Sequence, residues 1–535
     1  MPAPRVVMPM RTRSDAVRAP PQTGAAAVPG ARPETGQVPG AQRLAPAPQA
    51  GDTLSADTVR IASDLVRMGI TTRGAGIASV VLRKFDSYTH AGPVELVEAE
   101  QPPLVRYRLR LGDQVLDLGK LLFTASSDSV DVTGEGRTVT LKYREPSGAY
   151  ALDIRYHFDP ERYVVRVDGQ VTGLNALSPT LLLDIGPTLA VNEADSAQDE
   201  RALAYVVDSR KEGISSVPLR SVDAERVEEG PLTWVALKNK YFLAAALADT
   251  SAAGGAFGGL IAKPTGQKDA AALSATLPVD RDGRFTFRLF LGPQDYGRLA
   301  AVGHNLQDVS SYGWHFLRPI IRPLAHFIIW LLTTLHHALG IGYGWVLILF
   351  GMLVQIILWP LNVRAMRSQM KTMELQPRIK EIQDKFKQDP EKLQKEMMRL
   401  YREEGFNPLG GCLPMLIPWP VLITLFFVFE NTIEFRGVPF LWLPDLSRPD
   451  PLFILPIVLG ASIFVMQWMS MRTAPQQGGQ MKLMMYFMPI MMVVIFFRLA
   501  AGLNLYYAAS NLASIPRQVM LVRERMRVRE RLDKK

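Results

Sequence analysis

The chain has 535 residues, with 60 Lys and Arg against 51 Asp and Glu, a formal net charge of +9 and a single cysteine. One cysteine, Cys412, excludes an intrachain disulfide and a metal site made of several thiolates. The mean hydropathy of +0.06 averages a polar first half with a strongly apolar last third, and the excess positive charge lies beside the apolar segments, which indicates membrane orientation and argues against DNA as a partner.

Residues 1–54 are expected to form a disordered Pro/Ala-rich linker. The first 50 residues contain 10 Pro, 11 Ala and 4 Gly. This composition buries too little apolar surface to offset the entropy of ordering the chain. The same stretch holds neither the apolar region of a signal peptide nor a transmembrane helix.

The region 55–300 alternates polar and apolar residues with period two. Val105–Leu111 alternates apolar residues with three arginines, and 139–144 and 150–157 follow the same pattern. Turn-forming pairs such as Asp159-Pro160 separate these runs. Many short alternating strands divided by turns predict an antiparallel β-sandwich domain.

A long uncharged stretch begins after Arg322, but its first apolar part, Pro323–Leu335, has only 13 residues. As a helix it would rise about 20 Å, less than the roughly 30 Å hydrocarbon core of a bilayer. We therefore expect 308–340 to contain an amphipathic helix that lies in the membrane interface, with Trp314 and Trp330 among the headgroups.

The region 341–520 is predicted to be an α-helical membrane core of five spans. The apolar segments are Tyr343–Leu361, Leu413–Phe429, Leu452–Met469, Leu483–Phe497 and Leu499–Pro516. Segment 362–412 has 11 Lys and Arg against 8 Asp and Glu, and 517–535 has 8 against 3. Because basic segments stay in the cytoplasm and four spans separate these two, we predict that both 362–412 and the basic tail 521–535 are cytoplasmic and that the β domain lies outside.

The charged segment between the first two spans has the pattern of a helical hairpin. An apolar stripe that includes Met366 and Met370 recurs at three- and four-residue spacing, and Asp389-Pro390 predicts the start of a second helix, which carries Met397. The two helices either pack only against each other or form a platform on which these methionines contact an incoming chain. Methionine suits surfaces that bind differently shaped apolar partners, but it equally fills gaps in a helical core.

Four motifs in the second half of the chain are distinctive. They are Asn407-Pro-Leu-Gly-Gly-Cys-Leu-Pro414, Asp445-Leu-Ser447, Asp450-Pro-Leu-Phe-Ile-Leu-Pro456, and Gly502-Leu-Asn-Leu-Tyr-Tyr507 followed by Ser510-Asn511. With the order of the spans, they closely resemble the YidC-type membrane protein insertase family, in its Gram-negative-type form with a large periplasmic domain. The resemblance implies an inner-membrane insertase and chaperone whose five helices surround a hydrophilic groove open to the cytoplasm and to lipid.

The same resemblance implies the partners of the protein. Its clients would be nascent membrane proteins, inserted into the lipid bilayer either by this protein alone or together with the Sec translocon. The basic tail has three explanations: an orientation signal, a contact with anionic lipids, or a contact with the ribosome.

The resemblance further implies that Met352, Gln355, Arg498, Tyr506 and Tyr507 contact the client in the groove. The family usually has an arginine where this chain has Gln355, and an apolar or aromatic residue where it has Arg498, so Arg498 is a candidate for a relocated charge. Depth argues against a direct exchange, because helix rise puts Arg498 roughly 24 Å and Gln355 roughly 14 Å from the cytoplasmic side. Snorkelling of Arg498 to the outer interface is the alternative, and the two tyrosines alternatively belong to an interfacial aromatic belt.

The N-terminus departs from the family pattern, in which a membrane span precedes the linker in diderm bacteria. Either the true start lies upstream, or 319–335 is a span and the β domain is cytoplasmic. We favour the first explanation, because 319–335 is short and lies beside Arg318 and Arg322.

We find no catalytic, cofactor-binding or metal-binding pattern in the sequence and therefore expect no enzymatic activity. The adjacent His336 and His337 point apart on a helix. The remaining alternative is a secondary transporter or a lipid-moving protein, which would show internal repeats and ionisable residues at mid-membrane. We see neither feature in the sequence.

Overall fold

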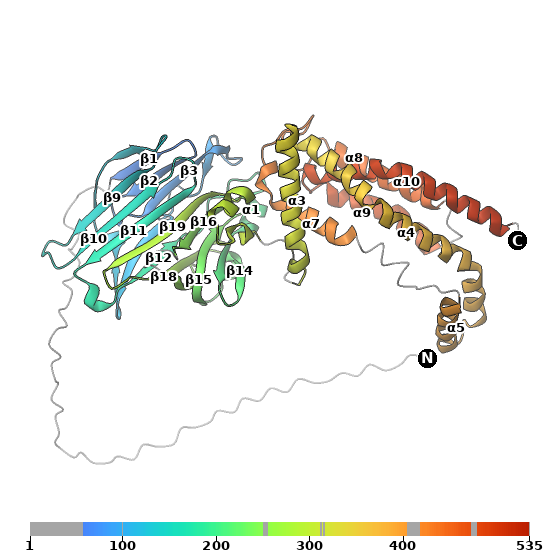
Figure 1. The fold of residues 1–535 in the computed structure, drawn as a ribbon, viewed down its shortest axis with the longest axis horizontal. Helices are drawn as coiled ribbons and strands as arrows, with labels where there is room; N and C mark the ends of the chain where they lie inside the picture. Colours follow the sequence, from blue (N-terminus) through green and yellow to red (C-terminus); the bar gives the residue numbers. More distant parts are fainter. Residues whose placement is uncertain are drawn as a thin grey trace, which may run out of the picture. The chain divides into compact units, whose positions relative to one another are not determined.

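A computed structural model of the chain describes residues 57–98, 100–249, 255–310, 313, 316–403, 418–471 and 479–533. The expected linker 1–54, Trp314 and the Asn407–Pro414 motif lie outside these residues. The described chain begins with a β-rich region and continues, from residue 318, as a helical region (Figure 1).

The β-rich region contains nineteen strands among the described residues. They are β1 Thr58–Ala62, β2 Val66–Thr71, β3 Ile77–Asp86, β4 Pro93–Glu95, β5 Val105–Leu111, β6 Gln114–Asp117, β7 Thr124–Ala125, β8 Ser129–Asp131, β9 Arg137–Arg144, β10 Ala151–Phe158, β11 Val164–Thr172, β12 Thr180–Ile185, β13 Ala204–Ser209, β14 Gly213–Pro218, β15 Arg226–Lys238, β16 Phe242–Ala248, β17 Phe257–Pro264, β18 Ala271–Pro278 and β19 Arg284–Pro293. The strands predicted at 105–111, 139–144 and 150–157 are confirmed by β5, β9 and β10.

Hydrogen bonds join the strands into two runs that meet at β15. One run is β8, β1, β2, β3, β5, β12, β18, β17, β15. The other is β15, β16, β19, β11, β10, β9, β7, whose central strands lie side by side in Figure 1. Within these pairings only β1 with β8 is parallel.

The two runs face each other across a buried core. The hydroxyl groups of Tyr107 on β5 and Tyr156 on β10 lie 2.7 Å apart, and Tyr107 packs against the ring of Phe287 on β19. Alternation explains this arrangement, because every second residue of β5 is buried while the arginines between them point away.

Nine α-helices are described. They are α1 Ser196–Ala202, α2 Tyr296–Val302, α3 Arg318–Leu339, α4 Tyr343–Lys385, α5 Pro390–Glu403, α7 Pro418–Asn431, α8 Ile454–Met471, α9 Gly479–Phe496 and α10 Ala501–Asp533. The helix start predicted at Asp389-Pro390 is confirmed, since the Lys392 amide donates to the Asp389 carboxylate at 3.1 Å.

Two helices are longer than the predicted spans. α4 joins the first span and the first arm of the hairpin in one helix of 43 residues, and α10 joins the last span and the basic tail in one of 33 residues. No glycine occurs between residues 352 and 404 or after Gly502, and the residues that follow each span are mainly Arg, Lys, Glu, Gln and Met, which favour the helix.

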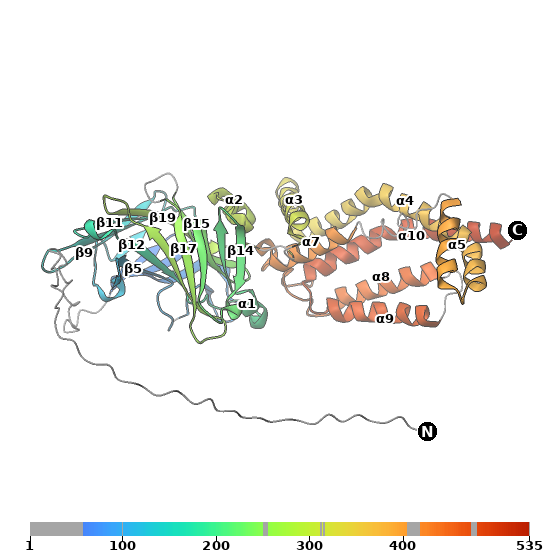
Figure 2. The same ribbon diagram turned by 90° about the horizontal axis from the view of Figure 1, so that it is seen from below.

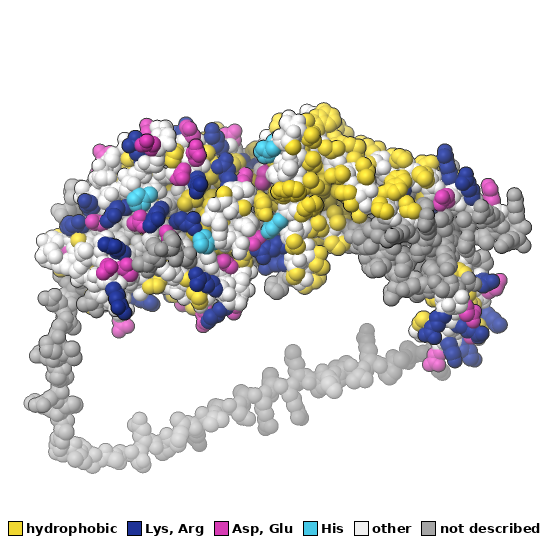
Figure 3. Space-filling model, in the orientation of Figure 1, with side chains coloured by type: hydrophobic (Ala, Val, Ile, Leu, Met, Phe, Trp, Pro, Cys, Tyr) yellow, Lys and Arg dark blue, Asp and Glu magenta, His cyan; other side chains and the backbone are white. Residues whose placement is uncertain are grey.

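The helical region has a small core and a largely apolar surface. Ile328 of α3, Phe350 of α4, Phe429 of α7 and Tyr506 of α10 belong to one buried cluster. Figure 3 shows hydrophobic side chains over much of the visible face of α3 and the helices next to it, whereas charged side chains are scattered over the β-rich region and over α5. Exposed apolar side chains include Trp330, Ile356, Ile357, Ile457, Val465, Phe487 and Ile490. Such a surface suits contact with lipid.

By length and composition, one described helical segment, Tyr343–Pro360, is long and apolar enough to cross a membrane. Pro420–Asn431 and Ile454–Met469 are shorter apolar helices. In Figure 2, α4, α8, α9 and α10 extend in similar directions. α8 is in contact with α10.

Candidate functional site

Polar side chains gather where α4, α8 and α10 meet. Gly351 on α4 lets its backbone approach α10 closely, because a Cβ atom there would lie 3.2 Å from the Tyr506 carbonyl oxygen and 3.3 Å from the Ser510 nitrogen. One helical turn further along α4, Gln355 occupies the same face. The close approach therefore brings the Gln355 side chain within reach of polar groups on α10.

Gln355 connects two of these groups. Its Nε2 atom donates to Ser510 Oγ at 2.8 Å, and its Oε1 atom accepts from Arg517 Nη1 at 3.1 Å. The amide is oriented by its partners, since a guanidinium can only donate. Both ends of the Gln355 side chain are thus engaged by α10.

The polar contacts continue between α10 and α8. Asn511 donates to Ser462 Oγ at 3.1 Å, and the Ser514 hydroxyl donates to the Asn511 carbonyl and lies 3.4 Å from the sulfur of Met466. We call the set Gln355, Ser462, Ser510, Asn511, Ser514 and Arg517 the polar seam. It lies between helices whose other surfaces are mostly apolar.

Only part of the predicted site coincides with the polar seam. Met352 lies nearly one turn before Gln355 and is 41% exposed. Tyr506 is 2% exposed and packs against Phe350 and Phe429 in the helical core. Tyr507, which is partly buried, contacts the Phe496 ring.

Arg498 is not brought to Gln355. It is exposed in the turn between α9 and α10, near the end of α10 where the Ala501 amide donates to the Arg448 carbonyl. The nine residues from Ala501 to Ser510 rise about 14 Å along the helix, which separates Arg498 from the polar seam. The role of Arg498 stays a prediction.

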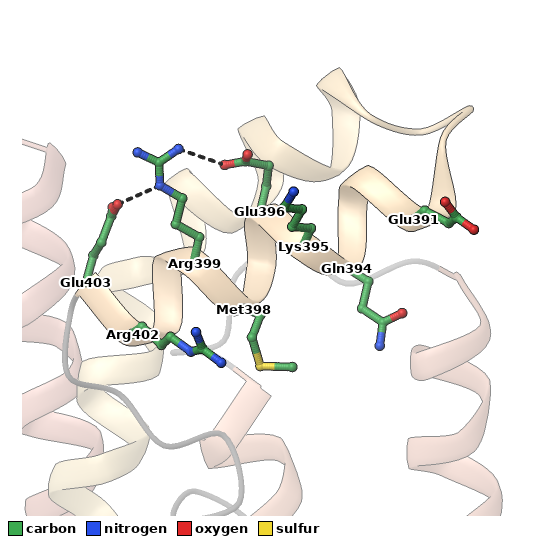
Figure 4. A pocket seen from close by; sticks show the side chains of 8 residues that line it. All are labelled: Glu391, Gln394, Lys395, Glu396, Met398, Arg399, Arg402 and Glu403. Carbon is green, nitrogen blue, oxygen red and sulfur yellow. Dashed lines mark hydrogen bonds and ion pairs between the residues drawn. The ribbon is translucent and has the colours of Figure 1, made fainter.

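The hairpin residues have different surroundings. Met366 and Met370 lie on α4, but their side chains are outside the described residues. Met397 on α5 is partly buried, whereas its neighbour Met398 is 47% exposed. Met398 and seven other residues of α5 line an open hollow of about 720 Å³. Figure 4 shows their side chains, among which Arg399 forms ion pairs with Glu396 and Glu403.

A second polar cluster joins the β-rich region to the turn after α7. Arg436 bonds Glu193 at 2.8 Å and the Asp86 carbonyl at 2.7 Å. Tyr88 donates its hydroxyl proton to Asp445 at 2.6 Å. Burial raises the pKa of Glu193, although Arg436 pulls that pKa down. We call Asp86, Tyr88, Glu193, Arg436 and Asp445 the outer clamp.

Glu434, in the short turn Ile433–Phe435 beside the outer clamp, predicts a pH-dependent stability. Burial, with a smaller effect of Asp295, raises the pKa of Glu434 from 4.5 to about 7. Between pH 4.5 and about 7, the Glu434 carboxyl therefore keeps its proton in the folded protein, whereas in the unfolded chain it has released it. The stabilisation is complete below pH 4.5 and is lost as pH rises to about 7, a change of about 3 kcal/mol.

The measurement is the thermal unfolding midpoint at pH 5 and pH 8. For the Glu434→Gln variant, which is neutral at both values, we expect a smaller drop between pH 5 and pH 8 than for the unaltered protein. The same drop in both proteins would contradict the assignment to Glu434.

Sequence reasoning missed Arg517, Ser462 and Ser514, and of the outer clamp it singled out only Asp445, in the motif Asp445-Leu-Ser447. For the polar seam, the available signal on α10 was the Ser510-Asn511 pair, which follows an apolar stretch. Among the described residues, no group of three or more His, Cys, Asp and Glu side chains is arranged to hold a metal ion.

Comparisons with known proteins give a consistent match. The family model described as the YidC periplasmic domain matches residues 58–330, and that of the 60Kd inner membrane protein matches residues 334–529. The membrane protein insertase YidC of Chlorobium limicola is 31% identical over 486 residues, 86% of this chain and 82% of that protein. The insertase YidC of Cupriavidus necator is 32% identical over 530 residues, 95% and 90% of the two chains.

A crystal structure of an active YidC insertase is also similar, with 18% identity and a TM-score of 0.33 over 86% of this chain and 92% of that one. YidC from Thermotoga maritima gives 14% identity and a TM-score of 0.30 over 86% and 99%.

Proposed function

Because the chain belongs to the YidC family of membrane protein insertases, we propose that it inserts its clients along the polar seam. It is an inner-membrane insertase with a periplasmic domain, and its substrates are nascent membrane proteins. Insertion needs no covalent chemistry, so the protein is not an enzyme. Because the chain belongs to this family, the alternative of a secondary transporter or a lipid-moving protein is dropped.

The observation that carries the proposal is the contact of Gln355 with both Ser510 and Arg517. A polar client segment costs several kcal/mol per charge at the centre of a bilayer. Hydroxyl, amide and guanidinium groups that line its path offer hydrogen bonds that lipid cannot. The client's own apolar helix then supplies the driving force by partitioning into lipid.

Unpaired polar atoms on α8 and α10, the helices that carry the seam, support a hydrated path. The side-chain oxygens of Gln467 on α8 and Asn504 on α10 are buried, and neither has a hydrogen-bond partner among the described residues. Buried groups of this kind commonly bind water. We infer that water reaches the seam and forms, with it, the hydrophilic groove open to cytoplasm and lipid.

The proposed architecture has five spans and a two-layered periplasmic sandwich. We assign the sandwich to 55–300, the interfacial helix to 308–340, the five-span core to 341–520 and the basic tail to 521–535. The hairpin 362–412 and the tail are assigned to the cytoplasm. The facing strand runs support the sandwich, and the apolar surface of α4, α8 and α9 supports the spans.

In this arrangement the hairpin receives the client. We propose that Met366, Met370 and Met397 contact its apolar segment before insertion, and that exposed Met398 adds to this surface. Further proposed partners are the Sec translocon, the surrounding lipids and, through the tail, the ribosome. The groove contacts proposed for Met352, Tyr506 and Tyr507 complete the client path.

Site-specific photocrosslinking tests the path. A photoreactive residue at position 355 is expected to crosslink a ribosome-stalled, single-span client in native membranes once the client's apolar segment has emerged. The matched control is Trp330, which is exposed on α3, a helix that contributes no residue to the seam. Equal crosslinks from both positions, or a crosslink from Met397 alone, would contradict insertion along this seam.

A further inference from the structure

We propose that Arg517 provides the positive charge of the polar seam and binds acidic side chains of the segment being translocated. The inference rests on the proposed insertion path and names the client chemistry that this path recognises. It assigns to α10 a charge that the resemblance would have placed on α4, at position 355.

The geometry fixes the guanidinium at the seam. Arg517 Nη1 lies 3.1 Å from Gln355 Oε1, and Gln355 is held from its other side by Ser510. Arginine has five N–H donors, so this single bond leaves donors for another acceptor. Gln355 thus positions the charge without using its capacity for further hydrogen bonds.

The charge at this position is not neutralised by Gln355, because an amide carries no net charge. Among the described residues, none of the ion pairs involves Arg517. The arginine is only partly exposed, and a partly desolvated guanidinium with a neutral partner gains from an approaching carboxylate. A planar, two-pronged carboxylate is the ligand that matches a guanidinium best.

The direction of the helix explains how a residue near the basic tail reaches the seam. Arg517 follows Ser510 by seven residues, or about 10 Å of helix. Side chains on a helix lean towards its N-terminus, so the long arginine side chain extends back towards Gln355. The backbone of Arg517 can therefore lie nearer the cytoplasm than its guanidinium group.

The same geometry distinguishes Arg517 from Arg498. Sixteen residues of α10, about 24 Å of rise, separate Arg517 from Ala501, the helix end beside Arg498. Of these two arginines, Arg517 is the one bonded to Gln355, the residue at which the family usually carries its arginine. The guanidinium of Arg517 on α10 thus lies beside position 355 of α4, where the family usually has an arginine.

Two clients test the proposal, one with several Asp residues in its translocated tail and one with Asn at the same positions. Insertion into membranes containing the full-length protein is measured by protease protection of the tail. Arg517→Ala is expected to reduce insertion of the Asp client roughly tenfold, as for loss of one hydrogen bond to a charged group, and to leave the Asn client unchanged. Arg137→Ala, at an exposed arginine of β9 that has no place in the proposed client path, is the control for loss of one positive charge and should change neither.

A reciprocal exchange separates the local role of the charge from its effect on topology. The double variant Gln355→Arg/Arg517→Gln keeps the net charge and returns the guanidinium to α4, so it should restore insertion of the Asp client. Equal losses of both clients in Arg517→Ala, no loss of either, or no restoration by the exchange would overturn the proposal. Failure of the insertion path itself would instead appear as a missing crosslink from position 355 to the Asn client.

Discussion

Replacing Arg436 with alanine is expected to destabilise the contact between the β-rich region and the helical region by about 3–5 kcal/mol, the usual cost of removing one partner of a buried ion pair. The side chains of Arg436 and Glu193 are 3% and 8% exposed. Without the guanidinium, the buried Glu193 carboxyl would lose its ion-pair partner and keep only the weaker influence of Lys240, and the Asp86 carbonyl would lose its donor.

The loss extends beyond the ion pair. The Arg436 guanidinium also lies over the ring of Tyr88, at 4.5 Å from its centroid, and over that of Phe242, at 5.5 Å. Stacking of this kind adds to the contact. Lysine at position 436 would retain the charge but not the planar stacking, so Arg436→Lys should fall between alanine and the unaltered protein.

Hydrogen exchange measures the opening of this contact. Peptides that cover 84–92 and 436–448 should exchange faster in Arg436→Ala, while peptides from β9–β11 should not change. Arg448→Ala is the matched control, because Arg448 also lies over Tyr88, at 5.1 Å, but is exposed. An equal effect of the two substitutions would show that the buried ion pair does not dominate the contact.

Local features of the structure could be predicted from the sequence because they depend on near neighbours. The alternation in Val105–Leu111 predicts a strand, since successive side chains point to opposite faces. Asp389 before Pro390 predicts a helix start for an equally local reason. Family membership could be predicted as well, because it rests on contiguous motifs and on the order of apolar segments.

The outer clamp could not be predicted in this way. Arg436 and Glu193 are 243 positions apart in the sequence, and neither is marked by a local pattern that would distinguish it from a solvated surface charge. Their pairing depends on how the β-rich region meets the turn after α7. That arrangement results from packing of the whole described chain rather than from propensities of single segments.

The residues of the polar seam can be predicted only in part, because most of their contacts join different helices. Gln355 is a candidate because it departs from the family pattern, and Arg498 is a candidate because it is a charge between two apolar spans. The sequence places Arg517 in the basic segment 517–535, because it follows Pro516, the predicted end of the last span. The continuous α10 instead carries Arg517 past that proline on the same helix as Ser510, within reach of Gln355.

Replacing Asp450 with alanine is expected to produce the second large loss, roughly 3–5 kcal/mol, if each of its three hydrogen bonds contributes about 1–1.5 kcal/mol. Asp450 is 1% exposed. Its carboxylate accepts from the Leu455 amide at 2.7 Å, the Leu452 amide at 3.0 Å and Trp442 Nε1 at 3.2 Å. Alanine would leave these donors at the start of α8 without an acceptor.

The Asp450→Ala substitution should also reduce the insertion of clients. α8 carries Ser462, which bonds Asn511 across the polar seam, so fraying the start of α8 loosens one side of the proposed client path. We expect Asp450→Ala to lower both the thermal unfolding midpoint and the insertion of the Asp and Asn clients alike. This loss differs from that of Arg517→Ala, which is selective for the acidic client.

Two comparisons show that the effect belongs to the buried cap of α8. Asp450→Asn keeps one acceptor oxygen but faces some of the same donors with an NH₂ group, so its loss should be intermediate. Asp389→Ala removes a similar cap at the start of α5. The Asp389 side chain is 42% exposed and makes one bond to a backbone amide and one solvent-accessible ion pair with Lys392, so its loss should cost about 1 kcal/mol. If Asp450→Ala cost no more than Asp389→Ala, the buried bonds of Asp450 would not be what holds the start of α8 against α10.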